Sequence, residues 1–145
     1  MTAQQARRTV ILGVARSDAH AVANHLIAMR LREAGFEAVN LGVCTPLADF
    51  AEALAAHPDA EAVLIGSLNG HAYEDLSDLP AFRAAGMLQC PVVVGGNLSV
   101  GSAKDESERL RLLELGVDHI LADADQIPLL LDLLRSERLA SLAGV

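Results

Sequence analysis

The sequence has few aromatic residues, two cysteines and no long apolar run, and each shortage excludes a class of function. Phe, Tyr and Trp make up 3% of the 145 residues and Trp is absent, so a stacking platform for nucleic-acid bases is missing. Cys44 and Cys90 share no metal-ligand spacing, which favours a reduced, cytoplasmic protein. No apolar run approaches the ~20 residues of a transmembrane helix. We therefore expect no nucleic-acid partner and no membrane partner.

The charge balance is acidic and the hydrophobic content is high. A formal net charge of −8 disfavours binding to a phosphate backbone. Hydrophobic residues make up 52% of the chain, which is enough for a core and leaves apolar surface for a ligand or a partner chain. The length fits one domain over residues 1–145, with a core over about residues 8–138.

Five short apolar runs alternate with five segments of helical periodicity. Val10–Leu12 and Val92–Val94 are continuously apolar, which is typical of parallel strands covered on both faces. The predicted strands are about Thr9–Val14, Ala38–Val43, Ala62–Ile65, Pro91–Val94 and Val117–Leu121. The predicted helices are about Ala21–Ala34, Leu47–His57, Leu79–Ala85, Ser107–Leu115 and Gln126–Arg138. In the last two helices the leucine spacing predicts faces packed on the sheet, formed by Leu110, Leu113, Leu129, Leu130, Leu133 and Leu134.

This alternation predicts an α/β fold with right-handed βαβ connections. Five repeats fit a flavodoxin-like, doubly wound parallel sheet of strand order 2-1-3-4-5, with helices on both faces. In that order the first, third and fourth strands end at one edge of the sheet, which is where open α/β sheets bind ligands. The fold by itself says nothing about the chemistry.

A histidine with a carboxylate two residues before it follows the first predicted strand. Asp18 can accept a hydrogen bond from one ring nitrogen of His20, which fixes the tautomer and leaves the other nitrogen free for a metal ion. A polar loop in which His20 only hydrogen-bonds locally is the competing interpretation of so short a motif. The other histidines are scattered and do not suggest a zinc site: His25, His57, His71 and His119.

Small residues dominate the three loops that this fold brings together. The loops are Ser17–His20, Gly66–Gly70 and Gly95–Gly101, and they would let a large flat ligand approach the backbone. They lack the acids of a phosphorylated receiver domain, the phosphate loop of flavodoxins and the glycine patterns of nucleotide sites. The spacing around Ser67 also departs from a hydrolase nucleophile elbow. Turn formation and helix capping are the alternative roles for these glycines and for Ser67.

Three ordered motifs resemble the signature of cobalamin-binding domains. The segment Asp18-Ala19-His20-Ala21-Val22-Ala23 is similar to the family's Asp-x-His-x-x-Gly motif. Ser67-Leu68 and Gly95-Gly96 are similar to its Ser-x-Leu and Gly-Gly motifs. From Thr9 to about Leu134 the chain resembles more closely the small subunits of glutamate mutase, also called methylaspartate mutase.

The resemblance implies a role for each residue of the motifs. His20 would be the lower axial ligand of cobalt, in place of the cofactor's own dimethylbenzimidazole, with Asp18 as its hydrogen-bond partner. Ser67 would contact the displaced nucleotide tail. The other implied contacts are Ser17, Ala19 and Ala21 on the corrin side, Gly66, Leu68, Gly95 and Gly96 along the tail, and Asn97, Leu98, Ser99, Val100 and Gly101 on its far wall. Ala23 stands where the motif has Gly, and Gly66 where Ser is frequent, which predicts a reduced affinity for the tail or a reshaped loop.

The resemblance also implies a reaction and a partner. The cofactor would be adenosylcobalamin, and the reaction a radical rearrangement of L-glutamate to threo-3-methylaspartate. A large barrel subunit would hold the substrate, in a heterotetramer that is active only with both subunits. A corrinoid carrier for methyl transfer and a stand-alone cobalamin sensor would use the same motifs, although we expect no helical cap of a carrier before the first strand. A flavodoxin-like interaction module without cobalamin is the remaining alternative.

Overall fold

The computed structural model describes residues 8–68, 71–96 and 102–142 of the chain. Within these residues five parallel strands form one sheet in the order β2-β1-β3-β4-β5. The strands are β1 (Arg8–Val14), β2 (Phe36–Asn40), β3 (Val63–Gly66), β4 (Val92–Gly95) and β5 (His119–Leu121). The predicted flavodoxin-like strand order is confirmed.

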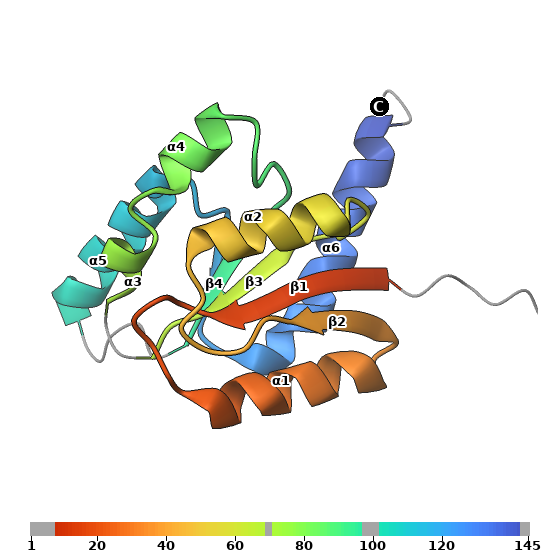
Figure 1. Ribbon diagram of the computed structural model, residues 1–145, viewed down its shortest axis with the longest axis horizontal. Helices are drawn as coiled ribbons and strands as arrows, with labels where there is room; N and C mark the ends of the chain where they lie inside the picture. The colour runs from red at the N-terminus through yellow and green to blue at the C-terminus, as the bar shows by residue number, and fades with distance from the viewer. Residues whose placement is uncertain (1–7, 69–70, 97–101, 143–145) are drawn as a thin grey trace, which may run out of the picture.

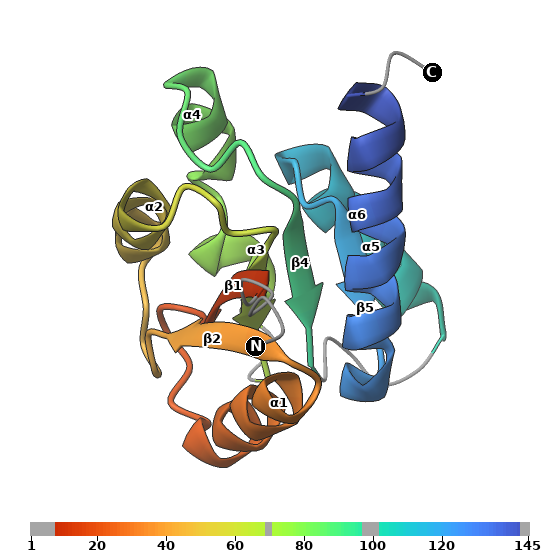
Figure 2. The ribbon, with the colours of Figure 1, turned by 90° about the vertical axis from the view of Figure 1, so that its right-hand side faces the viewer.

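Helices connect the strands and cover both faces of the sheet (Figures 1 and 2). They are α1 (Ala21–Glu33), α2 (Leu47–Ala56), α3 (Ala72–Asp75), α4 (Leu79–Ala84), α5 (Ser102–Leu115) and α6 (Ile127–Leu142), with a short 3-10 helix η1 (Ala124–Gln126) before α6. One face is covered by α1 and α6, through Leu31 and Leu131. The other face is covered by α2 to α5, through residues such as Phe50, Leu79 and Leu112. None of the helices in the described part of the chain is long and apolar enough to cross a membrane.

Several predicted boundaries need correction. The second strand lies at Phe36–Asn40 rather than Ala38–Val43, because the chain turns at Gly42, where φ is +86° and the backbone N–H donates to Oδ1 of Asn40 at 3.0 Å. The helix α3 was not predicted, since four residues are too few to show a helical period. Helix α5 begins at Ser102 instead of Ser107, and α6 continues to Leu142.

The predicted packing of leucines on α5 and α6 is wrong at four positions. Leu110, Leu113, Leu129 and Leu133 are exposed, and Leu129 keeps 65% of its surface. The fully buried leucines of these helices are Leu112 and Leu131. Because β5 is a three-residue strand at the sheet edge, the sheet beneath these helices is narrow, and few of their described side chains are buried.

The carboxyl edge of the sheet, where the strands end, brings the three predicted loops together. Val14 pairs with Gly66, and Gly66 with Gly95, so β1, β3 and β4 end at the same level. The arrowhead of β1 marks this edge in Figure 1. The loop after β2 joins them, since the Thr45 N–H donates to the Val14 carbonyl at 2.9 Å. This edge positions the residues described next.

Candidate functional site

Asp18 is one of several buried polar residues at the carboxyl edge, with 1% of its surface exposed. Its Oδ1 accepts a hydrogen bond from the His20 backbone N–H at 3.0 Å and lies 2.5 Å from Nδ1 of the His20 ring. Its Oδ2 accepts from the Leu68 backbone N–H at 2.5 Å. One carboxylate therefore ties the histidine to the loop that follows β3. The predicted pairing of Asp18 with His20 is present.

The ionisation of Asp18 sets the tautomer of His20. Burial by itself raises the pKa of the Asp18 carboxyl, but the hydrogen bonds from Leu68 and from the ring and backbone of His20 outweigh it and hold that pKa below its usual value. The ionised carboxylate accepts only, so Nδ1 of His20 is the protonated, donating nitrogen. Nε2 is left as a ligand atom, on a ring that is 57% exposed.

His20 is not part of a metal-binding cluster of side chains in the described part of the chain. Among the described residues, no group of three or more His, Cys, Asp or Glu side chains could hold a metal ion. A single imidazole oriented by a carboxylate suits a metal that brings its other ligands with it. Cobalt in a corrin ring is such a metal.

A cavity of about 480 Å³ lies between α1 and the segment that joins β5 to α6. His20 is not in its lining, but Ala23 and Asn24, on the first turn of α1 after His20, are. Most of its lining is apolar, including Leu12, Leu64, Val93 and Ile127. Five residues predicted to contact the tail line it together: Ala23, Gly66, Leu68, Gly95 and Gly96. Its position on the sheet and its lining fit a long, flat group with an apolar end.

Packing within the protein already accounts for the glycine at position 96. Its φ is +127°, and a Cβ built on it would lie 2.3 Å from the carbonyl oxygen of Ser67. By contrast, a Cβ on Gly66 would meet only atoms at 3.9 Å. The loop after β4 can therefore pack against Ser67 only with glycine at position 96. A direct contact of Gly96 with a tail stays a prediction.

Two buried oxygens at this edge lack a hydrogen-bond partner among the described residues. One is Oγ of the fully buried Ser67, whose neighbours Gly66 and Leu68 line the cavity. The other is Oδ1 of Asn24, which also lines it and which the sequence analysis missed. An unpaired buried polar group costs about 1–3 kcal/mol, so each of these oxygens is a candidate acceptor for a hydrogen bond from a bound molecule. No sequence signal marked Asn24, since a polar residue in a helix ordinarily faces solvent.

The remaining predicted residues lie at the rim or outside the described residues. Ala19 and Ala21 are exposed beside His20. Ser17 is also exposed, and its hydroxyl donates to Oδ2 of Asp75 on α3 at 2.7 Å. Asn97, Leu98, Ser99, Val100 and Gly101 fall outside the described residues.

Cys44 is a further rim residue that the sequence analysis did not connect with this site. It is exposed and has a left-handed backbone, with a φ of +52°. Its backbone N–H donates to the Asp18 carbonyl at 3.0 Å, and its thiol lies 3.5 Å from the same oxygen. The loop after β2 thus helps to hold Asp18 in place.

Comparison with known proteins agrees with this geometry. The family model for the B12 binding domain matches residues 8–127. The chain is 43% identical over 129 residues to the glutamate mutase sigma subunit of Halobacterium salinarum, covering 89% of this chain and 86% of that protein. The chain belongs to the B12-binding domain family, among the glutamate mutase sigma subunits. Two more sigma subunits are those of Haloarcula marismortui (sigma subunit 1; 42% over 128 residues; 88% and 83% covered) and Treponema denticola (38% over 112 residues; 77% and 80% covered).

Solved structures share the fold of these B12-binding domains. The monomethylamine corrinoid protein of Methanosarcina barkeri superposes with a TM-score of 0.69 at 22% identity, over 86% of this chain and 57% of that chain. A cobalamin-binding protein from Desulfitobacterium hafniense gives a TM-score of 0.65 at 19% identity, over 91% and 58%. The chain thus spans little more than half the length of these two proteins, and the likeness extends to the fold alone.

Proposed function

We propose that this chain is the cobalamin-binding small subunit of an adenosylcobalamin-dependent glutamate mutase. The observation that carries the proposal is the imidazole of His20, which a buried carboxylate orients and which directly precedes the turn of α1 that lines a largely apolar cavity. The names of its relatives support the same function. Nε2 of His20 would hold the cobalt, the cavity would take the nucleotide tail, and Oγ of Ser67 would hydrogen-bond to it.

The chemistry would be shared between the cofactor and the protein. When bound, adenosylcobalamin supplies the homolysis of its cobalt–carbon bond, which starts the radical rearrangement of L-glutamate to threo-3-methylaspartate. Asp18 keeps the proton of His20 on Nδ1 and makes the ring a stronger ligand. Because the same carboxylate binds the Leu68 N–H, the ligand and the tail loop share one anchor. The apolar lining excludes water from the tail.

A larger subunit would hold the substrate. No Arg or Lys side chain is among the described residues that line the cavity, so a dicarboxylate such as glutamate lacks a cationic partner there. The partner we expect is a barrel subunit that closes over the exposed rim around His20. The two kinds of subunit would form a heterotetramer, a methylaspartate mutase of the isomerase class, that is inactive without either one.

Reconstitution tests this function. The chain, adenosylcobalamin and the large subunit of a glutamate mutase should together form methylaspartate from glutamate, and no two of the three should do so. The variant His20→Ala serves as the matched control and should lose turnover. Turnover by the isolated chain, or failure to form a complex with any large subunit, would contradict the proposal. Methyl transfer without mutase activity would favour a corrinoid carrier instead.

A further inference from the structure

Asn24 presents its side-chain oxygen to the cavity in an orientation that the protein fixes. The residue is 6% exposed and lies on α1, one turn after His20. Its Nδ2 donates to Oδ1 of Asn40 at 2.8 Å, and this same oxygen accepts from the Gly42 N–H at 3.0 Å. Since only an oxygen can accept from a backbone N–H, the Asn40 amide cannot be turned around, and Asn24 must offer it the amino group. Oδ1 is therefore the atom of the Asn24 amide that is not bonded to Asn40.

Oδ1 of Asn24 is a hydrogen-bond acceptor for which the described residues provide no donor. It is buried and has no hydrogen-bond partner among them. Buried side-chain oxygens in folded proteins nearly always have a partner, so each exception calls for an explanation. Because Asn24 lines the cavity, the missing donor is one that a ligand brings.

The position of Asn24 along the cavity indicates which donor this is. Gly66 and Gly95 end their strands at the mouth, near the start of α1, while Leu64 and Val93 lie two residues deeper. The deep end is apolar and suits a flat base. The dimethylbenzimidazole base of cobalamin carries no N–H, and its phosphodiester carries no proton at neutral pH. The tail has two kinds of donor, the amide N–H of its aminopropanol linker next to the corrin at the mouth and the hydroxyl groups of the ribose further in. Asn40, which bonds Asn24, is in register with Leu64 and Val93, so the ribose hydroxyls are the donors at the level of Asn24.

We infer that Asn24 is a specificity-determining residue of the tail cavity, whose Oδ1 accepts a hydrogen bond from a ribose hydroxyl of the nucleotide tail. This inference rests on the proposed function, since it takes cobalamin as the ligand. Asn40 is the positioning residue that keeps the oxygen of Asn24 turned toward the cavity. Asn24 then favours corrinoids with a complete nucleotide tail over those without one.

Comparing the binding of two corrinoids that share the same ring distinguishes a contact with the tail from a general effect on the fold. Adenosylcobalamin has the nucleotide tail and adenosylcobinamide lacks it, and Kd is measured for both by equilibrium dialysis. Asn24→Leu should weaken adenosylcobalamin about tenfold, the size expected for one buried hydrogen bond, and change adenosylcobinamide less than about twofold. Asn40→Ala should give a smaller loss of the same kind. His25→Leu, at the exposed neighbour on α1, is the matched control and should leave both Kd values unchanged.

Thermal unfolding of the cobalamin-free protein gives a second readout. Asn24→Leu removes an unpaired buried acceptor together with the hydrogen bond to Asn40, whose Oδ1 still accepts from the Gly42 N–H, so the unfolding temperature should change little. If Asn24→Leu does not fold, Asn24→Ala and Asn24→Ser carry the same comparison. Equal weakening of both corrinoids, or unchanged binding of adenosylcobalamin, overturns the inference while the proposed function stands. Wild-type protein that binds neither corrinoid overturns both.

Discussion

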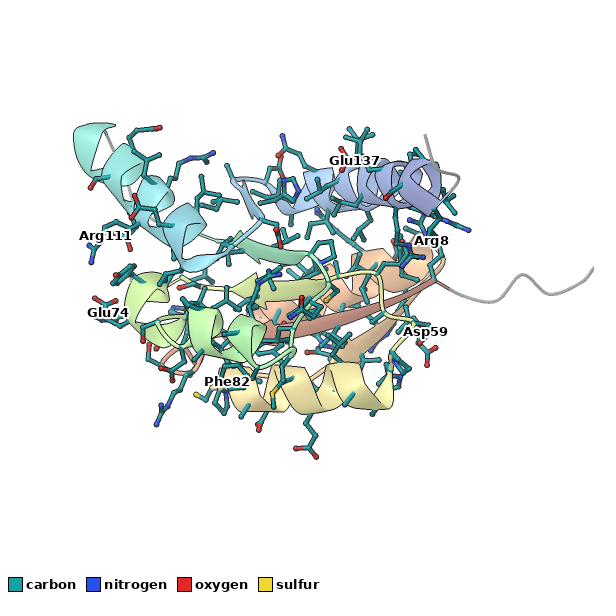
Figure 3. The ribbon with its side chains drawn as sticks, turned by 90° about the horizontal axis from the view of Figure 1, so that it is seen from above. Arg8, Asp59, Glu74, Phe82, Arg111 and Glu137 are labelled. Atoms are coloured by element: carbon teal, nitrogen blue, oxygen red, sulfur yellow. The ribbon has the colours of Figure 1, made fainter. Side chains whose placement is uncertain are left out.

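The two ends of the sheet differ in how their polar groups are satisfied. Figure 3 shows Arg8, Asp59 and Glu137 toward one end of the molecule and Glu74 and Arg111 toward the other. The amino end has the larger cavity, of about 720 Å³ between α2, α6 and the starts of β3 and β4. The carboxyl end has the smaller cavity, of about 480 Å³. Size alone would therefore select the end without His20.

The hydrogen bonding of their polar side chains distinguishes the two ends of the sheet, whereas cavity volume does not point to the ligand site. At the amino end the Arg8 guanidinium donates twice to Glu61, at 2.7 and 2.8 Å, and once to Asp132 at 2.6 Å. The hydrogen bonds to Glu61 contribute most to raising the pKa of Arg8. At the carboxyl end Ser67 and Asn24 keep buried oxygens without partners among the described residues. Nε of Arg83, on the amino-end side, is also buried without a partner among the described residues, so the feature that distinguishes the carboxyl end is an unpartnered buried oxygen, Oδ1 of Asn24, that lines its cavity.

The largest expected effect comes from adding one methyl group at the carboxyl end. Gly96→Ala would place Cβ against the Ser67 carbonyl at a φ that side chains rarely adopt, and should lower the free energy of unfolding by about 2–3 kcal/mol. Gly66→Ala is the matched control, because its Cβ would meet only ordinary contacts. Urea unfolding measures both variants. Equal stability of the two would show that the packing of Gly96 on Ser67 is misplaced.

Removing one carboxylate charge at each end should affect adenosylcobalamin binding at the carboxyl end and the stability of the fold at the amino end. Asp18→Asn removes the carboxylate that orients His20 and should weaken adenosylcobalamin binding about 10–100-fold, the usual effect of such a partner. Glu61→Gln disrupts the ion pair with Arg8 and should lower stability by about 1 kcal/mol with the Kd unchanged. Dialysis and urea unfolding of both variants test this. A change in Kd for Glu61→Gln would break the comparison between the two ends.

One cysteine lies at each end of the sheet, so the reactivity of each thiol tests that end separately. Burial raises the pKa of the Cys90 thiol, at the amino end, to about 11. This thiol stays protonated at pH 8, with ~0.1% thiolate, and gains reactivity only as the pH approaches that pKa. Exposed Cys44 should react with iodoacetamide at least about tenfold faster, as followed by mass spectrometry. Adenosylcobalamin should slow the reaction of Cys44 only, and protection of Cys90 instead would place the ligand at the wrong end.

The smallest effect is expected from a helical alanine at each cavity. Ala23→Gly removes the methyl group that lines the carboxyl-end cavity and should tighten adenosylcobalamin binding a few-fold. Glycine also costs about 1 kcal/mol of helix stability, so Ala55→Gly at the amino-end cavity is the control for that cost. Only Ala23→Gly should change the Kd. Unchanged or weaker binding would show that the cavity already accommodates the methyl group.

The sequence predicts the strand order and the loops of the site because both depend on local patterns. Continuous apolar runs such as Val92–Val94 mark the buried strands, and the short spacing of Asp18 and His20 lets them pair within one loop. The exposed leucines Leu110 and Leu129 were misjudged, since helical spacing is compatible with more than one face. Which face is buried depends on the width of β5, a tertiary property.

Asn24 shows why the rest of the site could not be predicted. A polar residue in a helix ordinarily faces solvent, so its sequence position alone does not suggest burial. Its orientation depends on Asn40 and Gly42, which lie 16 or more residues away along the chain. The contact of Leu68 with Asp18 spans 50 residues and is equally invisible in the sequence. Such tertiary hydrogen bonds become visible only once the strands are paired.

Ligation of cobalt by His20 is the central claim, and electron paramagnetic resonance tests it most directly. The chain is loaded with cobalamin, reduced to the cobalt(II) form and compared with and without ¹⁵N-labelled histidine. Nitrogen coupling to cobalt should change from triplets to doublets on labelling, and His20→Ala should abolish the histidine coupling. Coupling that is unchanged by the histidine label and arises from the benzimidazole nitrogen would contradict the account.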